Sequence, residues 1–210
     1  MKLVLVRHGV ADGAAGRCVG HHDLALAEHG ARAVARLAAE WHEAANRGEA
    51  AVAPPSRVVA SDLARALDSA RALATPWGLA VHADPRLREM HFGAWDGRPW
   101  AELEAEDGAR LRAWMDDWVR TRAPGGESFE DVVARTAACV AELSANTAPD
   151  ATVLVVAHAG AIRAVLCDLL RWPLAQAFAL RVDHARATAL AVTPAGVELL
   201  FHNADRVPAA

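Results

Sequence analysis

The chain has 210 residues, of which 53% are apolar, and this is enough for the core of one α/β domain or of two small ones. Its formal net charge is −4 and no basic stripe stands out, which argues against nucleic acid as a partner. No apolar run is long enough to span a membrane, and the apolar start is too short for a signal peptide, so we expect a cytoplasmic protein with no membrane partner.

Short apolar, β-branched runs alternate with segments of helical spacing along most of the chain. A continuous run such as LVLV at 3–6 is typical of a strand that is buried on both faces. Strands that alternate with helices predict a mostly parallel sheet covered on both faces. In chain order we expect a strand at 2–6, a helix at 27–45, a strand at 56–61, a helix at 63–78, a strand at 79–83, one or two helices at 100–120, a helix at 128–146, a strand at 151–158, a helix at 159–172 and a hairpin at 185–202.

Basic residues and histidines stand where the predicted strands end. Arg7 and His8 come directly after the first strand, Arg65 follows the second by one helical turn, and His158 ends the fourth. Because ligands of such sheets bind at the carboxyl ends of the strands, we expect these four side chains to converge on one site. Arginine side chains, together with the free N–H groups of the helix after His158, favour a phosphate group as ligand.

A histidine at this place suggests covalent chemistry. A neutral imidazole can attack phosphorus, and the ordinary histidine pKa of about 6.5 leaves the ring largely unprotonated near neutral pH. The leaving oxygen then needs a proton donor, and water later needs a base. Glu89 is best placed for both tasks, because a carboxyl beside a phosphate dianion has a raised pKa. The alternative for Glu89 is an ion pair with Arg86 or Arg88. Arg65 could likewise pair on its own helix with Asp68.

Four ordered segments carry a resemblance to a known family. LVRHG near the N-terminus, SDLARALDSA at 61–70, LREMHFGAWDG at 87–97 and VVAHAGAIRAVL at 155–166 resemble the histidine phosphatase superfamily, the phosphoglycerate mutase-like proteins. The resemblance implies a three-layer α/β/α sandwich with a mostly parallel central sheet. It implies one domain over 1–210, in which we expect a helical lid or insertion at about 99–127. The family needs no metal or cofactor, because phosphoryl transfer rests on positioning and charge neutralisation.

The resemblance also implies the roles of the site residues. His8 would be the phosphorylated nucleophile and Glu89 the proton donor. Three further residues would take part in catalysis by holding the phosphoryl oxygens, namely Arg7, Arg65 and His158. Arg17 and Ala159 would add substrate contacts.

The loop 10–15 departs from the family pattern. Many relatives read RHG-Glu/Gln-Thr and carry an Asn a few residues later that contacts phosphate, whereas this chain has Val10, Ala11 and Ala14 at these places. Phosphate binding then rests more on Arg17 or on backbone N–H groups, or it is weaker.

The segment GRCVGHHDLALAEHG at 16–30 resembles the GRCYGxxDxPLxxxG block of α-ribazole phosphatases, which act late in cobalamin biosynthesis, and PGGES at 124–128 is also found there. The long insertion typical of cofactor-dependent mutases is absent from the sequence. We therefore expect a phosphomonoester hydrolase that acts on a small molecule, α-ribazole 5′-phosphate. The alternatives are a broad-specificity sugar or nucleotide phosphatase, a phosphoglycerate mutase, or a non-catalytic domain that binds a phosphorylated ligand. The sequence leaves the oligomeric state open, a homodimer included.

Two groups of residues suggest a metal at first sight. His21, His22 and Asp23 are adjacent, but adjacent residues rarely point at one ion, so we expect a solvated loop. The three cysteines lack Cys-x-x-Cys spacing and are expected to be free thiols, at Cys18, Cys139 and Cys167.

The remaining polar and aromatic candidates for the site could also have purely structural roles. Trp114 and Trp118 are expected in core or lid packing. His91 lines the mouth of the site or has no role there, with equal weight. Glu127 and Ser128 form part of a flap or only start a helix. The other histidines are expected at the surface or in satisfied positions, and these are His29, His42, His82, His184 and His202.

Overall fold

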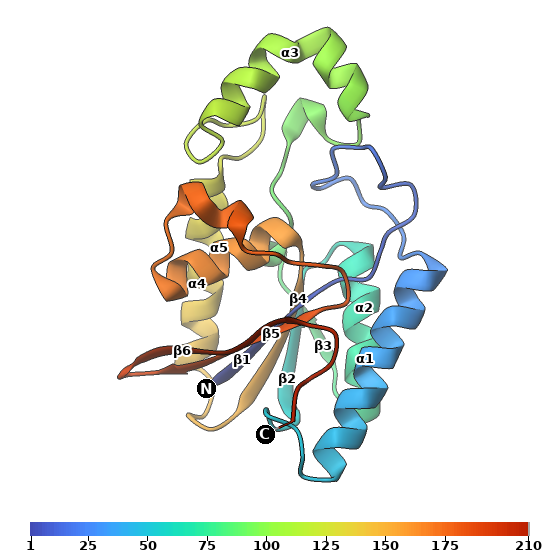
Figure 1. The fold of residues 1–210 in the computed structure, drawn as a ribbon, viewed down its shortest axis with the longest axis vertical. Coiled ribbons are helices and arrows are strands. Elements are labelled where there is room, and N and C mark those ends of the chain that lie inside the picture. The colour runs from blue at the N-terminus through green and yellow to red at the C-terminus, as the bar shows by residue number, and fades with distance from the viewer. Residues whose placement is uncertain (210) are drawn as a thin grey trace.

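The structure, a computed structural model, describes residues 1–209. A central sheet is covered by helices, and α3 stands apart from it, beyond one end of the strands (Figure 1). The strands are β1 (Lys2–Arg7), β2 (Pro55–Ala60), β3 (Val81–Ala83), β4 (Thr152–Ala157), β5 (Ala187–Thr193) and β6 (Gly196–Ala204). The helices are α1 (Glu28–Asn46), α2 (Ala64–Ala74), α3 (Trp100–Asp116), α4 (Phe129–Ala145) and α5 (Ala159–Leu170). Short 3-10 turns are η1 (Thr75–Trp77), η2 (Pro85–Leu87), η3 (Gly93–Trp95) and η4 (Leu174–Ala179).

The six strands form one sheet in the order β3-β2-β4-β1-β5-β6. The first four strands in this order run parallel, while β5 and β6 form an antiparallel hairpin on the far side of β1. The predicted mostly parallel sheet and the terminal hairpin are therefore confirmed. The two central strands pair Arg7 with Ala157, so the residues that follow, His8 and His158, leave the sheet side by side.

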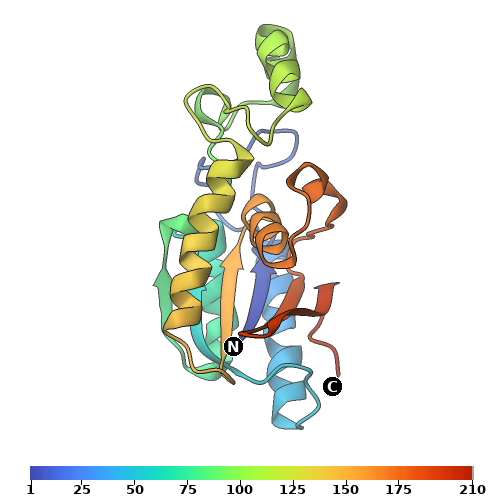
Figure 2. The same ribbon diagram turned by 90° about the vertical axis from the view of Figure 1, so that its left-hand side faces the viewer.

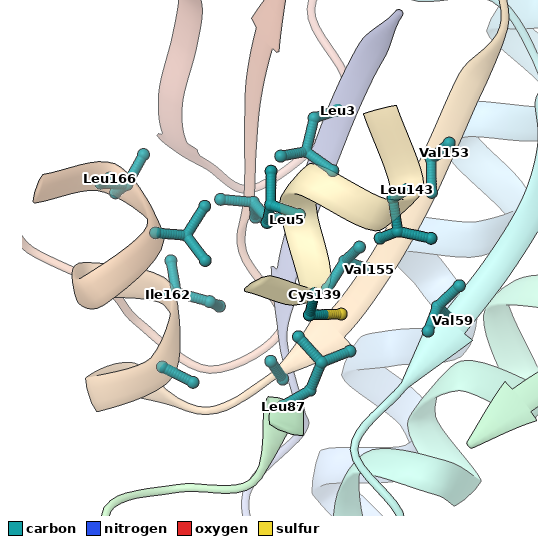
Figure 3. Close-up of a cluster of buried hydrophobic side chains, with 14 of the residues drawn as sticks. Leu3, Leu5, Val59, Leu87, Cys139, Leu143, Val153, Val155, Ile162 and Leu166 are labelled. Carbon is teal, nitrogen blue, oxygen red and sulfur yellow. The ribbon is translucent and has the colours of Figure 1, made fainter. Parts of the chain in front are cut away.

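Two apolar layers sandwich the sheet, and the alternation of side chains along each strand explains them. Leu3 and Leu5 of β1 point toward α4 and α5, where they meet Leu143 and Ile162 (Figure 3). The intervening Val4 and Val6 point to the opposite face, against α1 and α2. A strand buried on both faces must be apolar at every position, which accounts for the continuous run. Figure 1 shows α4 and α5 on one side of the strands and α1 and α2 on the other, and Figure 2 looks onto the side that carries α4 and α5. The predicted sandwich is confirmed.

Most predicted helix boundaries agree with the structure within a few residues. The predicted helix at 63–78 is instead α2 followed by η1, because Pro76 lacks the N–H that would continue the helix. Gly78 then ends the segment in the left-handed region, with φ of 63°. Ser128 caps α4 through a reciprocal pair of hydrogen bonds with Asp131, so its role is to start the helix.

The segment at 100–120, for which one or two helices are predicted, contains α3, which is bent at Asp107. Asp107 accepts a hydrogen bond of 2.8 Å from the indole N–H of Trp95 and another from Arg110, and this anchors the bend to η3.

Between residues 1 and 209, no helix combines the length and the apolar character that crossing a bilayer requires.

Candidate active site

A cavity of about 710 Å³ opens at the carboxyl ends of β1 and β4. Its floor carries five of the residues expected from the sequence, namely Arg7, His8, Arg65, Glu89 and Ala159. Arg17 also lines the cavity, but as an exposed residue at the rim, where it donates to the carbonyl of Gly97.

His8 lies on the cavity wall in one defined tautomer. Its Nδ1 lies 2.6 Å from the carbonyl oxygen of Gly9, which can only accept, so Nδ1 carries the proton. Its Nε2 therefore holds a lone pair, and this atom accepts a hydrogen bond of 3.3 Å from Nε of Arg65. Burial, followed by the charge of Arg65, holds the pKa of His8 well below its usual value. Although only 5% of His8 is exposed, the ring faces the cavity and is unprotonated at neutral pH.

The glycine after His8 is required by close packing. A Cβ atom on Gly9 would lie 2.5 Å from the carbonyl oxygen of Gly30, in the first turn of α1. The N–H of Gly9 donates to the hydroxyl of Ser69 on α2, at 3.1 Å. The loop that carries His8 is thus clamped between two helices, which fixes the ring.

The two arginines are anchored differently. Arg65 is 1% exposed, and its two terminal nitrogens donate to the carbonyl oxygens of His22 and Gly20 at 3.0 and 2.7 Å. The alternative ion pair of Arg65 is wrong, since Asp68 pairs with Arg71 instead. Arg7 donates one bond of 2.7 Å to the carbonyl of Val182. Its buried Nε has no partner within residues 1–209.

His158 lies behind His8, with 4.8 Å between the ring centroids. It is fully buried and does not line the cavity, unlike the other expected ligands. Its Nε2 lies 2.8 Å from the hydroxyl of Ser61, while its Nδ1 has no hydrogen-bond partner in the described part of the chain. Burial, then the proximity of His8, keeps the pKa of His158 well below its usual value. Such an unpaired buried nitrogen costs free energy unless a ligand oxygen satisfies it.

Glu89 lies on the cavity with its carboxylate at the N-terminus of α5. One carboxylate oxygen accepts from the N–H of Gly160 at 3.1 Å, and the other from the N–H of Met90 at 2.9 Å. A Cβ on Gly160 would lie 2.1 Å from this carboxylate, so a glycine is needed there. The alternative pairs of Glu89 are wrong, because its two arginine neighbours bind other carboxylates: Arg86 pairs with Asp84 and Glu142, and Arg88 with Asp62.

The segment that carries Glu89 is held from behind by Arg135 of α4. The guanidinium of Arg135 donates to the carbonyl of Glu89 at 2.9 Å and pairs with Glu127. Glu127 also binds the backbone of His91, so it belongs to this support and not to a flap. His91 itself does not line the cavity; its ring packs on His21, with centroids 4.5 Å apart.

The residues 21–23 form no metal site. The ring of His21 lies 2.9 Å from the carbonyl of Glu89, and Asp23 accepts from the N–H of Ala64 at the start of α2. The expectation of a purely solvated loop is wrong for His21, which is half-buried. Over residues 1–209, no three His, Cys, Asp or Glu side chains are grouped so as to hold a metal ion, and the three thiols are free.

Several polar residues that line the cavity were given no place in the site by the sequence, among them His29, Arg163 and His184. His184 was expected at the surface or satisfied, yet it lines the cavity with its ring centroid 5.2 Å from that of His8. Its irregular segment between η4 and β5 carries no local pattern that could have revealed it. Arg163 also lines the cavity and donates to the carbonyl of Leu180. Arg163 lies one turn after the start of the predicted helix that follows His158, and this spacing could have indicated that it lines the site.

Part of the cavity wall is aromatic. Trp114 and Trp118 pack as expected, Trp114 against Trp95 and Trp118 against Phe178, but both also line the cavity. The aromatic side chains on its wall are Phe92, Trp100, Trp114, Trp118, Phe129 and Phe178.

Residues 3–205 match the family model of the histidine phosphatase superfamily, branch 1. The chain belongs to this superfamily. It is a phosphatase of the histidine phosphatase type.

Two curated phosphatases illustrate the range of similar histidine phosphatases. The chain is 42% identical over 184 residues to the glucosyl-3-phosphoglycerate phosphatase of Mycobacterium tuberculosis, covering 83% of this chain and 77% of that protein. It is 31% identical over 184 residues to the adenosylcobalamin/α-ribazole phosphatase of Salmonella typhimurium, covering 87% and 86%. The crystal structure of the α-ribazole phosphatase from Shigella flexneri superposes with a TM-score of 0.87 at 27% identity, over 99% of this chain and 98% of that one.

Proposed function

We propose that this histidine phosphatase hydrolyses phosphomonoesters through a phosphohistidine at His8. The observation that carries the proposal is the tautomer of His8, whose Nε2 lone pair is directed away from the Gly9 carbonyl. The cavity that His8 lines also contains a cation, Arg7, and a carboxylate, Glu89. A nucleophile, an anion-binding group and a proton carrier therefore share one cavity.

In the proposed reaction, Arg7, Arg65 and His158 hold the phosphoryl oxygens while Nε2 of His8 attacks phosphorus. A bond forms from Nε2 to phosphorus as the bond to the ester oxygen breaks, and Glu89 gives its proton to the leaving alkoxide. Glu89 then takes a proton from water, whose oxygen attacks the phosphohistidine. Inorganic phosphate leaves, and His8 regains its lone pair.

This sequence of steps requires Arg65 to release His8. In the structure, Nε of Arg65 donates to the nucleophilic nitrogen itself. A phosphoryl oxygen close to Nε2 offers Arg65 a charged acceptor in its place, and charge-assisted bonds are the stronger ones. The unpaired Nε of Arg7 and Nδ1 of His158 are two further donors that the same group could satisfy.

We propose α-ribazole 5′-phosphate as the substrate, because its leaving group carries a flat benzimidazole ring. The cavity has six aromatic residues on its wall, and an aromatic ring of a ligand stacks favourably on such side chains. Two of them, Trp100 and Trp114, come from α3, which lies within the segment 99–127 for which we propose the role of a lid.

The second candidate is glucosyl-3-phosphoglycerate, which the 42% identity to the mycobacterial enzyme favours. That substrate carries a carboxylate and a sugar instead of an aromatic ring. Arg17 and Arg163 line the cavity and could pair with the carboxylate.

Phosphate release from a panel of esters at equal concentration tests the proposal. We expect kcat/KM for α-ribazole 5′-phosphate to exceed that for ribose 5-phosphate, which lacks the ring, by about tenfold or more. Higher kcat/KM for glucosyl-3-phosphoglycerate would select the second candidate. Strong dependence on a bisphosphorylated primer with little phosphate release would indicate a mutase and contradict both.

A further inference from the structure

His184 occupies a place beside the nucleophile that the proposed reaction leaves unused. Its ring meets the ring of His8 at 64°, with 5.2 Å between the centroids, and it lines the cavity. Among residues 1–209, neither ring nitrogen of His184 has a hydrogen-bond partner. A polar ring on a cavity wall that donates to nothing in the protein is available to a ligand.

The backbone holds His184 from both sides. The N–H of Ala185 donates to the carbonyls of Arg7 and His8, at 3.0 and 3.3 Å. On the other side, Asp183 exchanges two hydrogen bonds with the side chain of Asn203 on β6, at 2.8 and 2.9 Å. Because its neighbour is bonded to the nucleophile's own backbone, the position of His184 is coupled to that of His8.

Ala185 adopts an unusual conformation to make these bonds. Its φ is 51°, in the left-handed region that is strained for a residue with a Cβ. Strained residues of this kind concentrate at functional sites. The strain here turns the chain so that His184 faces the cavity while the next N–H reaches β1.

The surroundings keep the ring of His184 neutral. Burial, and next the charge of Arg7, lower the pKa of His184 to about 4, against the opposing effect of Asp183. Arg65 on α2 and His29 on α1 face it as well and act in the same direction as Arg7. A neutral imidazole carries one N–H donor, and it adds no positive charge that would repel the nearby arginines.

The loop 10–15 offers the cavity no side-chain donor. Residues 10–15 line it with Val10, Ala11, Asp12, Gly13, Ala14 and Ala15, none of which has a side-chain N–H or O–H when Asp12 is ionised. Two of the three N–H-bearing nitrogens of Arg65 are committed to backbone carbonyls. Of the other lining arginines, Arg17 donates to the carbonyl of Gly97 and Arg163 to that of Leu180. A phosphoryl group beside His8 therefore has Arg7 as its main side-chain donor on the cavity wall, with His158 behind His8.

We propose that His184 contacts the substrate and donates its ring N–H to a terminal oxygen of the phosphoryl group, both in the ester and in the phosphohistidine. This inference rests on the proposed function, because it concerns the same phosphoryl group. His184 supplies from the C-terminal side of the chain a donor that the loop 10–15 does not provide.

Three substitutions separate hydrogen bonding from packing. His184→Ala removes both, His184→Phe keeps an aromatic ring against His8 but has no donor, and His184→Asn restores an N–H. The exposed His82 on β3 gives the matched control, His82→Ala. Far-UV circular dichroism and thermal melts establish that each variant folds.

Inhibition by vanadate and by inorganic phosphate measures binding of the phosphoryl group directly. We expect the inhibition constants and kcat/KM to worsen by about tenfold or more in His184→Ala and His184→Phe alike, since a bond to a charged group is lost. His184→Asn should recover most of this loss, and His82→Ala should match the wild type. Wild-type constants in His184→Phe would overturn the inference, because packing alone would then suffice.

Trapping of acid-labile phosphate on the wild-type protein separates failure of the proposed role of His184 from failure of the proposed function. If the wild type traps the label and His184→Phe binds vanadate as the wild type does, only the role of His184 fails. If the wild type traps no label, the proposed function fails first.

Discussion

The Nε atom of Arg65 lies 3.3 Å from Nε2 of His8, the nitrogen that would bond to phosphorus. This contact has two effects on the nucleophile. The charge of Arg65 adds to burial in lowering the pKa of His8, which keeps Nε2 unprotonated. The same donor is already within reach of any oxygen that approaches Nε2, so little reorganisation is needed on binding.

Replacement of the nucleophile gives the most direct test. His8→Ala should lower kcat by at least about a thousandfold and abolish trapping of acid-labile phosphate, because no nitrogen remains to form the intermediate. Steady-state phosphate release and rapid quench with labelled substrate measure the two effects. Wild-type turnover in this variant would rule out the phosphohistidine route.

Glu89→Gln should discriminate between leaving groups. An amide cannot give up a proton, so turnover of alkyl phosphates should fall by about a hundredfold or more, whereas p-nitrophenyl phosphate should be much less affected. A plot of log kcat against leaving-group pKa makes the comparison. Equal losses for both classes of ester would remove Glu89 from the role of acid.

Gly160→Ala should also lower the turnover of alkyl phosphates, although Gly160 itself carries no proton donor. The added Cβ would lie 2.1 Å from the carboxylate of Glu89 and displace it, while the fold of α5 tolerates alanine. We expect kcat to fall more for alkyl phosphates than for p-nitrophenyl phosphate. Gly108→Ala in α3 is the matched control, because its Cβ would meet only the flexible side chain of Arg112. If Gly160→Ala kept wild-type rates on alkyl phosphates, the position of Glu89 would not matter to the reaction.

Arg65→Lys keeps the charge but loses the geometry. A lysine ammonium cannot reproduce the fork that binds the carbonyls of Gly20 and His22 while reaching His8. We expect kcat/KM to fall by about a hundredfold, with weaker vanadate inhibition. The exposed Arg71 of the same helix provides the control, Arg71→Lys, which should leave both quantities unchanged.

Stability should decrease in mild acid because His8 and His158 are buried without charge. Burial lowers the pKa of both below the value of about 6.5 that applies in the unfolded chain, and it lowers the pKa of His184 to about 4. Below pH 6.5 the unfolded state therefore binds protons that the folded state does not. The stability present above pH 6.5 is lost as the pH falls, by at most about 1.4 kcal/mol per pH unit for each such histidine. Urea unfolding at pH 7, 6 and 5 measures this slope, and His158→Asn should reduce it by about the share of one histidine. A free energy of unfolding that stayed constant over this range would contradict the prediction.

Much of the fold follows from local pattern. The run LVLV and its counterpart VLVV at 153–156 must be buried on both faces, and this alone indicates parallel strands between two helical layers. The ends and bends of helices depend in addition on single residues and on contacts between elements. Pro76 converts the end of one predicted helix to a 3-10 turn, and the bond between Asp107 and Trp95 that anchors the bend in α3 joins residues in different elements.

The sequence by itself determined which residues stand at the strand ends, because strand termini and glycines are encoded within a few neighbouring positions. The placement of Arg7, His8 and His158 in one region follows once the strands are parallel and adjacent. Only the tertiary structure decided that Arg65 is held by the carbonyls of a distant loop. It alone also placed His184 against His8, through backbone bonds between Ala185 and β1. The reason is that such contacts join segments far apart in sequence, and no local periodicity records them.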